Sequence, residues 1–237
     1  MSDTNLSLAF AVAVVLGNAI YLYVAGPRFA ANYPGAKVPG NLSLAWGALV
    51  SGIAALYVAT FIPSGSGSLL HPWWGSGAVG ALTATVSLGW LALLVDVRIR
   101  RLPTRLTEVM AAESFAAWLL AYALAGPSLE GLIAPFLGAL VWYLPFAIGG
   151  GRGTGKGDRR LAPVLGFGLG TVSVPAALVG LVIAFLLAGA VALRLRFSGA
   201  SKRDRFALGP FLLAGTWGAW AMAALVPLLA ALQGVQS

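Results

Sequence analysis

Long apolar stretches alternate with short polar connections along the whole chain. A helix that spans a membrane needs about 20 apolar residues, and somewhat fewer where flanking residues snorkel to the interface. Windows of that length predict about eight spans, at 6–25, 42–62, 77–96, 108–125, 129–148, 159–172, 174–193 and 206–232. We therefore expect an all-α fold, a polytopic bundle of membrane helices that forms a single domain over 1–237.

Composition supports this membrane class. Hydrophobic residues make up 59% of the chain and charged residues only 9%, which is typical of a protein whose surroundings are mostly lipid. The absence of cysteine excludes disulfides, thiolate metal sites and a cysteine nucleophile. The net charge of +8 would suggest a nucleic-acid partner in a soluble protein, but the positions of the charges give a better explanation.

All fifteen basic residues fall in alternate connections or in the first two positions of the span that follows, and the other connections and both termini hold none. They lie after the first, third, fifth and seventh predicted spans: Arg28 and Lys37; Arg98, Arg100, Arg101 and Arg105; Arg152, Lys156, Arg159 and Arg160; Arg194, Arg196, Lys202, Arg203 and Arg205. Connections that face the cytosol collect Lys and Arg. We therefore expect a multi-pass protein of the cell (plasma or inner) membrane with both termini outside. Its surroundings would be membrane lipid, and no nucleic-acid partner is expected.

Two of the seven acidic residues lie at the ends of apolar runs. Asp96 closes the third predicted span, at a depth where a lone ionised carboxylate is energetically unfavourable. Asp158 opens the sixth span from the same side. The chain between them leads out and back, so these carboxylates, 62 positions apart, are expected to meet at the cytosolic face. Two carboxylates close together in a low-dielectric site do not both ionise, which provides an acid and a base at neutral pH. The alternative is that each neutralises neighbouring arginines.

Other residues in the spans suggest structural roles. Glu108 and Glu113 open the fourth predicted span, where a carboxylate stabilises a helix N-terminus. Small residues such as Gly166 and Gly170 recur in the spans and let helices approach closely.

Motifs for nucleotides, metals and serine proteases are incomplete. Gly150, Gly155 and Lys156 fit a phosphate-binding loop, but Gly157 stands where a serine or threonine must hold magnesium. The only histidine, His71, excludes a two-histidine zinc site within one chain and disfavours a serine–histidine protease, because it lies outside the predicted spans. We therefore expect no metal and no cofactor.

Three sequence blocks carry a more specific pattern. The first, DVRIRRLPTRLT at 96–107, has an aspartate at the end of a span, then a basic stretch, a Leu-Pro pair and a Leu-Thr. The second is GTGKGDRRLAPVLGFGLG at 153–170, and the third is RFALGPFLLAG at 205–215. In this order the blocks resemble the type IV prepilin peptidases, which are membrane aspartic proteases of the GxGD group.

The resemblance implies a role for each matching position. Asp96 and Asp158 take the two catalytic places of the family, and hydrolysis would proceed by general acid–base catalysis without a metal or cofactor. Glycines of the second block would leave room for the substrate backbone. The matching positions that would shape the site are Gly153, Gly155, Gly157, Arg160, Pro103 and Pro210, with Arg160 standing where lysine is usual. The implied substrates are prepilin or pseudopilin-like proteins, cut at their leader peptides.

The same resemblance divides the chain into N-terminal helices, 1–75, and a peptidase core, 76–237. Long members of the family carry a cytosolic insert with Cys-x-x-Cys motifs and also methylate the new N-terminus. This chain has sixteen residues at 26–41 and no cysteine, so we expect cleavage without methyl transfer. Thr104 departs from the family pattern, in which an acidic or amide residue often follows the proline.

Two other functions fit the same carboxylates. Presenilin-like and signal-peptide peptidases share the GxGD arrangement, although Val95 stands where they typically have tyrosine and a late Pro-Ala-Leu segment is absent. A non-proteolytic membrane protein would use Asp96 and Asp158 as a proton or cation site. Such a site is expected near the bilayer midplane between inverted repeats, whereas these carboxylates are predicted at one face and we detect no repeat.

Overall fold

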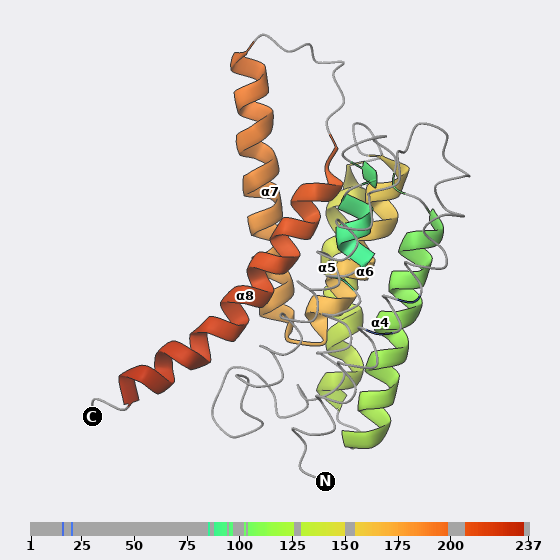
Figure 1. Ribbon diagram of the computed structural model, residues 1–237, viewed down its shortest axis with the longest axis vertical. Helices are drawn as coiled ribbons and strands as arrows, with labels where there is room; N and C mark the ends of the chain where they lie inside the picture. Colours follow the sequence, from blue (N-terminus) through green and yellow to red (C-terminus); the bar gives the residue numbers. More distant parts are fainter. Residues whose placement is uncertain are drawn as a thin grey trace.

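The computed structural model describes residues 16, 20, 85, 88–93, 95, 96, 102, 104–125, 129–149, 155–198 and 207–234. Over these residues the regular structure is entirely helical, which confirms the predicted all-α class for this part of the chain. The helices are α4 (Thr104–Ala125), α5 (Leu129–Ile148), α6 (Lys156–Gly170), α7 (Val174–Phe197) and α8 (Gly209–Gly234). They run alternately up and down, so that α4, α6 and α8 begin at the same end (Figure 1). Both termini, most of the first two predicted spans, Pro103, Gly153 and His71 lie outside the described residues.

The predicted spans locate these helices, but several helix ends differ. α5 coincides with its predicted span, and α7 starts at Val174 as predicted but continues to Phe197. α4 begins at Thr104 rather than at residue 108, and no acidic residue lies in its first turn. The prediction that Glu108 opens this helix is therefore wrong. Hydropathy marks the residues that prefer lipid, whereas backbone capping decides where helical hydrogen bonding begins.

Three glycines bring α5 and α6 into direct backbone contact. A Cβ atom added at Gly138 of α5 would lie 2.8 Å from the Cα atom of Gly170 in α6. A Cβ atom added at Gly166 would lie 2.7 Å from the Cβ atom of Trp142. Interiors are close-packed, so a larger residue at these positions would force the two helices apart. The prediction that Gly166 and Gly170 permit close helix packing is confirmed.

Trp142 is the largest fully buried side chain of the core and links α5 to α7. Its indole N–H donates to the carbonyl oxygen of Ala177 at 2.7 Å, so the one polar atom of the ring is satisfied. A Cβ atom added at Gly180 would lie 3.2 Å from the ring and 2.6 Å from Leu169. The start of α7 is therefore held against both α5 and α6.

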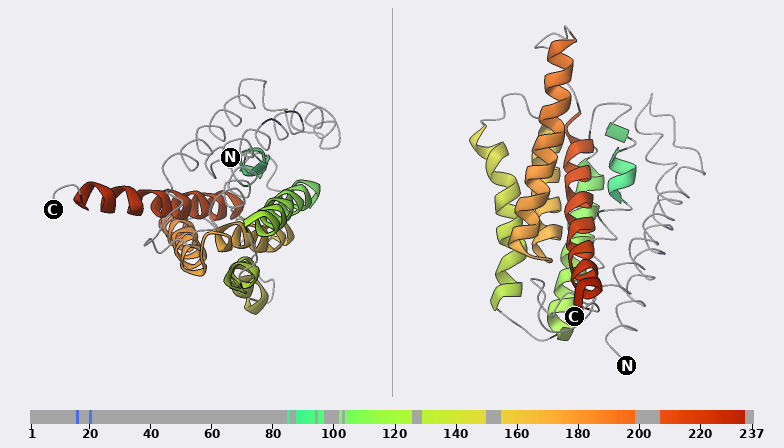
Figure 2. Two further views of the ribbon diagram at one scale, coloured as in Figure 1. Left: turned by 90° about the horizontal axis from the view of Figure 1, so that it is seen from below. Right: turned by 90° about the vertical axis from the view of Figure 1, so that its left-hand side faces the viewer.

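Two described helices, α5 and α7, are long and apolar enough to cross a membrane. Both expose large apolar side chains, among them Leu132, Phe136, Leu140 and Leu144 of α5 and Leu178, Val182, Phe185 and Leu186 of α7. An apolar surface of this extent suits contact with lipid rather than with water. α7 also rises beyond the other helices at the end where α6 and α8 begin (Figure 2).

Candidate active site

Asp158 is held at the start of α6. Gly155 is the N-cap residue, with extended backbone angles (φ −68°, ψ 149°), and its N–H donates to Asp158 Oδ2 at 3.3 Å. Asp158 itself lies in the first turn, where the free N–H groups of a helix favour a negative charge. The side chain is only 9% exposed. The start of α6 therefore presents this carboxylate to the protein interior.

Asp96 is the last described residue of a helical segment that includes residues 88–93, 95 and 96, here called the Asp96 segment. Ala92 and Val95 of this segment belong to the main hydrophobic core. Asp96 is 4% exposed, and its Oδ2 atom makes no hydrogen bond within the described part of the chain. A buried carboxylate oxygen without a partner destabilises a fold, so it indicates a function rather than a contribution to stability.

Gly209, the first residue of α8, joins the two carboxylates. Its backbone N–H lies against both Asp96 and Asp158, and a Cβ atom added to it would lie 2.6 Å from Asp96 Oδ2. The Asp96 segment and the first turns of α6 and α8 therefore meet at one end of the bundle (Figure 1). The structure thus brings together the two carboxylates that the sequence singles out, hereafter the Asp96–Asp158 pair.

Burial dominates the protonation of Asp158. Removal from water raises the pKa of its carboxyl group above the ordinary value of 3.8, while the N–H groups of Gly155 and Gly209 act in the opposite direction. The net shift of the pKa is upward, so Asp158 keeps its proton to a higher pH than an exposed aspartate does. A pair in which one carboxyl group holds a proton and the other is ionised contains an acid and a base at one place.

The two arginines that follow Asp158 bond to other helices. Arg159 donates from Nη2 to the Tyr143 hydroxyl at 2.8 Å, with its guanidinium carbon 5.5 Å from the ring centroid. Arg160 donates from Nη1 to Thr104 Oγ1 at 2.9 Å, which ties α6 to the start of α4. The threonine that departs from the family pattern thus serves as the partner of this arginine. These bonds argue against the alternative in which Asp158 neutralises the arginines beside it.

Two glycines of the second block, Gly155 and Gly157, occupy different positions relative to α6. Gly155 is the turn residue before α6, but Gly157 lies inside the first turn of the helix. A Cβ atom added at Gly157 would lie 2.7 Å from the Cβ atom of Leu102, so this glycine makes room for a side chain of the protein itself. Pro210 is the second residue of α8, where the missing N–H of proline is not needed for helical hydrogen bonding.

Leu102 and Gly209 were not expected at the site. The Leu102 Cδ1 atom would lie 3.2 Å from a Cβ atom at Gly209 and 3.5 Å from one at Gly157, so Leu102 lies between α6 and α8 beside the pair. The Gly-Pro step before an apolar run could have indicated a helix start at residue 209. Leu102 is the leucine of the Leu-Pro pair in the first block, but of that pair only Pro103 was assigned a role in the site.

No protein-family model, curated protein or solved structure matches this chain significantly. Within the described ranges, no group of three or more His, Cys, Asp and Glu residues is placed to hold a metal ion. The assignment of a function therefore depends on the Asp96–Asp158 pair and on the sequence blocks around it.

Asp158→Asn is expected to stabilise the folded protein at neutral pH. The pKa of Asp158 is raised by folding, so its ionisation is disfavoured in the folded state, and this penalty appears as the pH rises above the unfolded value of 3.8. Asparagine does not titrate and still offers an oxygen to the Gly155 N–H. The unfolding temperature in detergent should exceed that of the wild type near neutral pH and match it below about pH 3. An equal gain at both pH values would contradict the raised pKa.

The placement of Leu102 against Gly157 can be tested by cross-linking, because the chain has no cysteine. The variant Leu102→Cys/Gly157→Cys should form an intramolecular disulfide on mild oxidation. Ideal Cβ atoms at these positions lie 2.7 Å apart, and a small shift gives the Cβ separation of about 3.8 Å that a disulfide requires. Disulfide formation removes hydrogen from the two thiols, and a measurement of the intact protein mass would detect this loss. Leu102→Cys/Gly189→Cys is the control, because a Cβ atom at Gly189 has nothing within 4 Å and this pair should not cross-link. If both pairs cross-linked to a similar extent, or if neither did, the placement of Leu102 against Gly157 would be wrong.

Proposed function

We propose that the protein is a membrane aspartic endopeptidase that cleaves the leader peptides of type IV prepilin-like proteins at the cytosolic membrane face. The observation that carries this proposal is the Asp96–Asp158 pair, two nearly buried carboxylates from distant parts of the chain that meet beside the N–H of Gly209. Perturbed acidic groups that converge at one point are typical of active sites. The resemblance of the surrounding sequence blocks to GxGD proteases supports hydrolysis over other uses of such a pair.

In the proposed reaction the pair holds one proton between its two carboxyl groups. The ionised carboxylate takes a proton from a water molecule, which attacks the scissile carbonyl carbon, while the protonated carboxyl group donates its proton to the carbonyl oxygen. The tetrahedral intermediate then collapses, the amine leaves with a proton, and the pair returns to its starting state. Burial favours this chemistry because it prevents both groups from ionising together.

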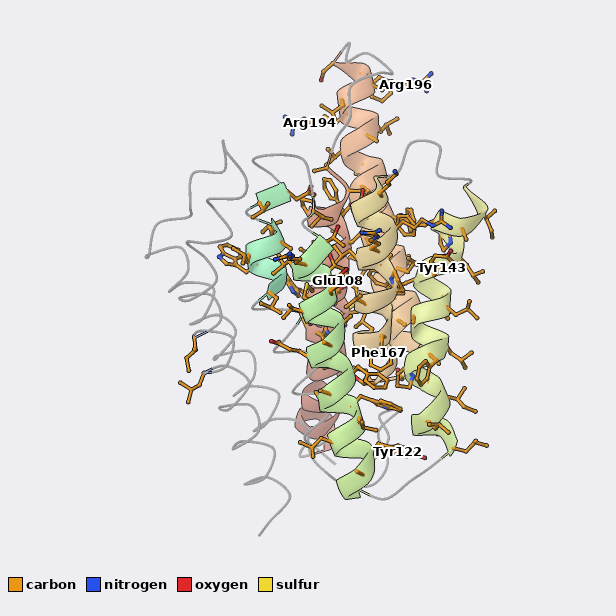
Figure 3. The ribbon with its side chains drawn as sticks, turned by 90° about the vertical axis from the view of Figure 1, so that its right-hand side faces the viewer. Glu108, Tyr122, Tyr143, Phe167, Arg194 and Arg196 are labelled. Carbon is orange, nitrogen blue, oxygen red and sulfur yellow. The ribbon has the colours of Figure 1, made fainter. Side chains whose placement is uncertain are left out.

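The proposed topology has about eight spans with both termini outside, N-terminal helices over 1–75 and a peptidase core over 76–237. Two described helices that are long and apolar enough to span a membrane support a membrane location, and the multi-pass arrangement is proposed from the apolar windows and the alternating basic connections of the sequence. The end of the bundle that holds the pair also carries Lys156, Arg159 and Arg160, with Arg194 and Arg196 on the protruding end of α7 (Figure 3). Basic residues at this end favour a cytosolic location for the site.

Cleavage by the wild-type chain tests this function. The purified protein in liposomes is incubated with a prepilin-like substrate and an S-adenosyl methyl donor, and the mass of the new N-terminus is measured. We expect one cut between the leader and the apolar helix, without methylation of the product. A cut inside the apolar helix would instead favour a presenilin-like or signal-peptide-peptidase activity. No cut by folded protein in several prepilin-like substrates would favour a proton or cation site.

A further inference from the structure

The first turn of α8 has few free backbone donors. A helix begins with N–H groups that have no partner inside the helix. In α8 the second residue is Pro210, which has no N–H, and the N–H groups of Phe211 and Leu212 donate to the carbonyl oxygen of Leu208 at 3.0 and 3.1 Å. The remaining donor of this turn is the N–H of Gly209, and it lies against both carboxylates of the Asp96–Asp158 pair.

Residue 209 also has no room for a side chain. A Cβ atom there would lie 2.6 Å from Oδ2 and 3.4 Å from Cγ of Asp96, and 3.2 Å from Leu102 Cδ1. α8 has little freedom to move away, because Gly215, further along the same helix, packs on α7: a Cβ atom added there would lie 2.6 Å from the Cβ atom of Ala184. A side chain at residue 209 would therefore displace the Asp96 carboxylate.

We propose that Gly209 is a positioning residue for the Asp96–Asp158 pair. Its bare Cα lets Asp96 approach the start of α8, and its N–H, at the positive end of the helix, holds the two carboxylates at one point. As a contribution to catalysis this inference rests on the proposed peptidase function. The contact between residue 209 and Asp96 is testable without it.

Among the residues that the structure describes, the charged side chains near the pair are engaged elsewhere or exposed. On α6, Lys156 is exposed, while Arg159 and Arg160 donate to Tyr143 and Thr104. On α4, Arg105 and Glu108 are exposed. The backbone N–H groups of Gly155 and Gly209 are therefore the donors that the described structure places against the pair. For this reason the arrangement of the pair depends on the position of Gly209.

Gly209→Ala tests the effect on catalysis. A misplacement of about 1 Å in an active site lowers the turnover rate by up to about a hundredfold, so we expect kcat to fall tenfold to a hundredfold with KM little changed. Displacement of Asp96 also changes the electrostatic surroundings of Asp158, so the pH–rate profile should shift from that of the wild type. Gly218→Ala in the same helix is the control, because a Cβ atom there meets Ile183 at an ordinary 3.5 Å. A Gly209→Ala protein with the wild-type rate and pH profile would overturn the inference.

A stability cycle tests the contact even if the wild type cleaves no substrate, an outcome that would count against the proposed function alone. Gly209→Ala should lower the unfolding temperature by about 3 °C or more in the wild-type background. In an Asp96→Ala background the carboxylate is gone, and the drop should be less than half as large. An equal drop in both backgrounds would overturn the inference. If Gly209→Ala alone does not fold, recovery of folding by Asp96→Ala supports the contact and failure to recover refutes it.

Discussion

Asp96→Asn and Asp158→Asn are each expected to lower the rate of leader cleavage by about a thousandfold or more. Asparagine has nearly the shape of aspartate but neither accepts nor donates the proton that moves in the reaction, and general acid–base groups contribute about a hundredfold to ten-thousandfold each. Both side chains are nearly buried, so bulk water cannot readily take over their role. The rate is measured with equal amounts of folded protein and one prepilin-like substrate.

Glu108→Gln is the matched control for these variants. It makes the same chemical change at an exposed carboxylate on α4 (Figure 3). Substitutions on the surface away from a site usually have small effects, so we expect cleavage within about twofold of the wild type. If Glu108→Gln lost as much activity as the two aspartate variants, the loss would reflect the general charge of the protein and not the pair.

Gly166→Leu should have the largest effect on folding. The added side chain would enter the contact between α5 and α6, where a Cβ atom alone would lie 2.7 Å from the Cβ atom of Trp142. Overpacking of a core by a few methylene groups destabilises proteins by about 1–3 kcal/mol, and here the obstacle includes the backbone of Gly138. We expect a loss of about 3 kcal/mol or more in the free energy of unfolding, measured by reversible denaturation in detergent.

Gly189→Leu is the comparison for this packing prediction. A Cβ atom at Gly189 on α7 has nothing within 4 Å, so leucine there should change the free energy of unfolding by only about 0.5 kcal/mol, within the usual range for surface substitutions. Equal losses from the two variants would mean that the contact between α5 and α6 does not depend on the small size of residue 166.

Hydropathy predicted the helical class and the position of each described helix, because apolar length is what a membrane helix requires. It predicted the first residues of α5 and α7 but not those of the other described helices. α4 starts at Thr104, four residues before its apolar window, and α6 starts at Lys156, three residues before its own. The first turn of α6 is polar and follows the N-cap residue Gly155, and such a cap is a feature that hydropathy does not measure.

The candidate site was predictable to a similar extent. Asp96 and Asp158 were singled out because carboxylates are rare at the ends of apolar runs, and the alternation of the spans placed them at one end. Gly209 and Leu102 could not be identified in this way, because their importance lies in the space that they leave or fill. Such roles depend on the angle at which three helix ends converge, which no residue pattern specifies.

The central claim is that Asp96 and Asp158 work as one acid–base pair, and a comparison of four cleavage rates tests it most directly. The rates are those of the wild type, Asp96→Asn, Asp158→Asn and the double variant. Residues that act as a unit show strongly non-additive effects, so we expect each single variant to lose nearly all activity and the double variant to be no slower than the slower single one. A double variant whose loss equals the product of the two single losses, or a single variant that keeps most of the wild-type rate, would contradict the claim.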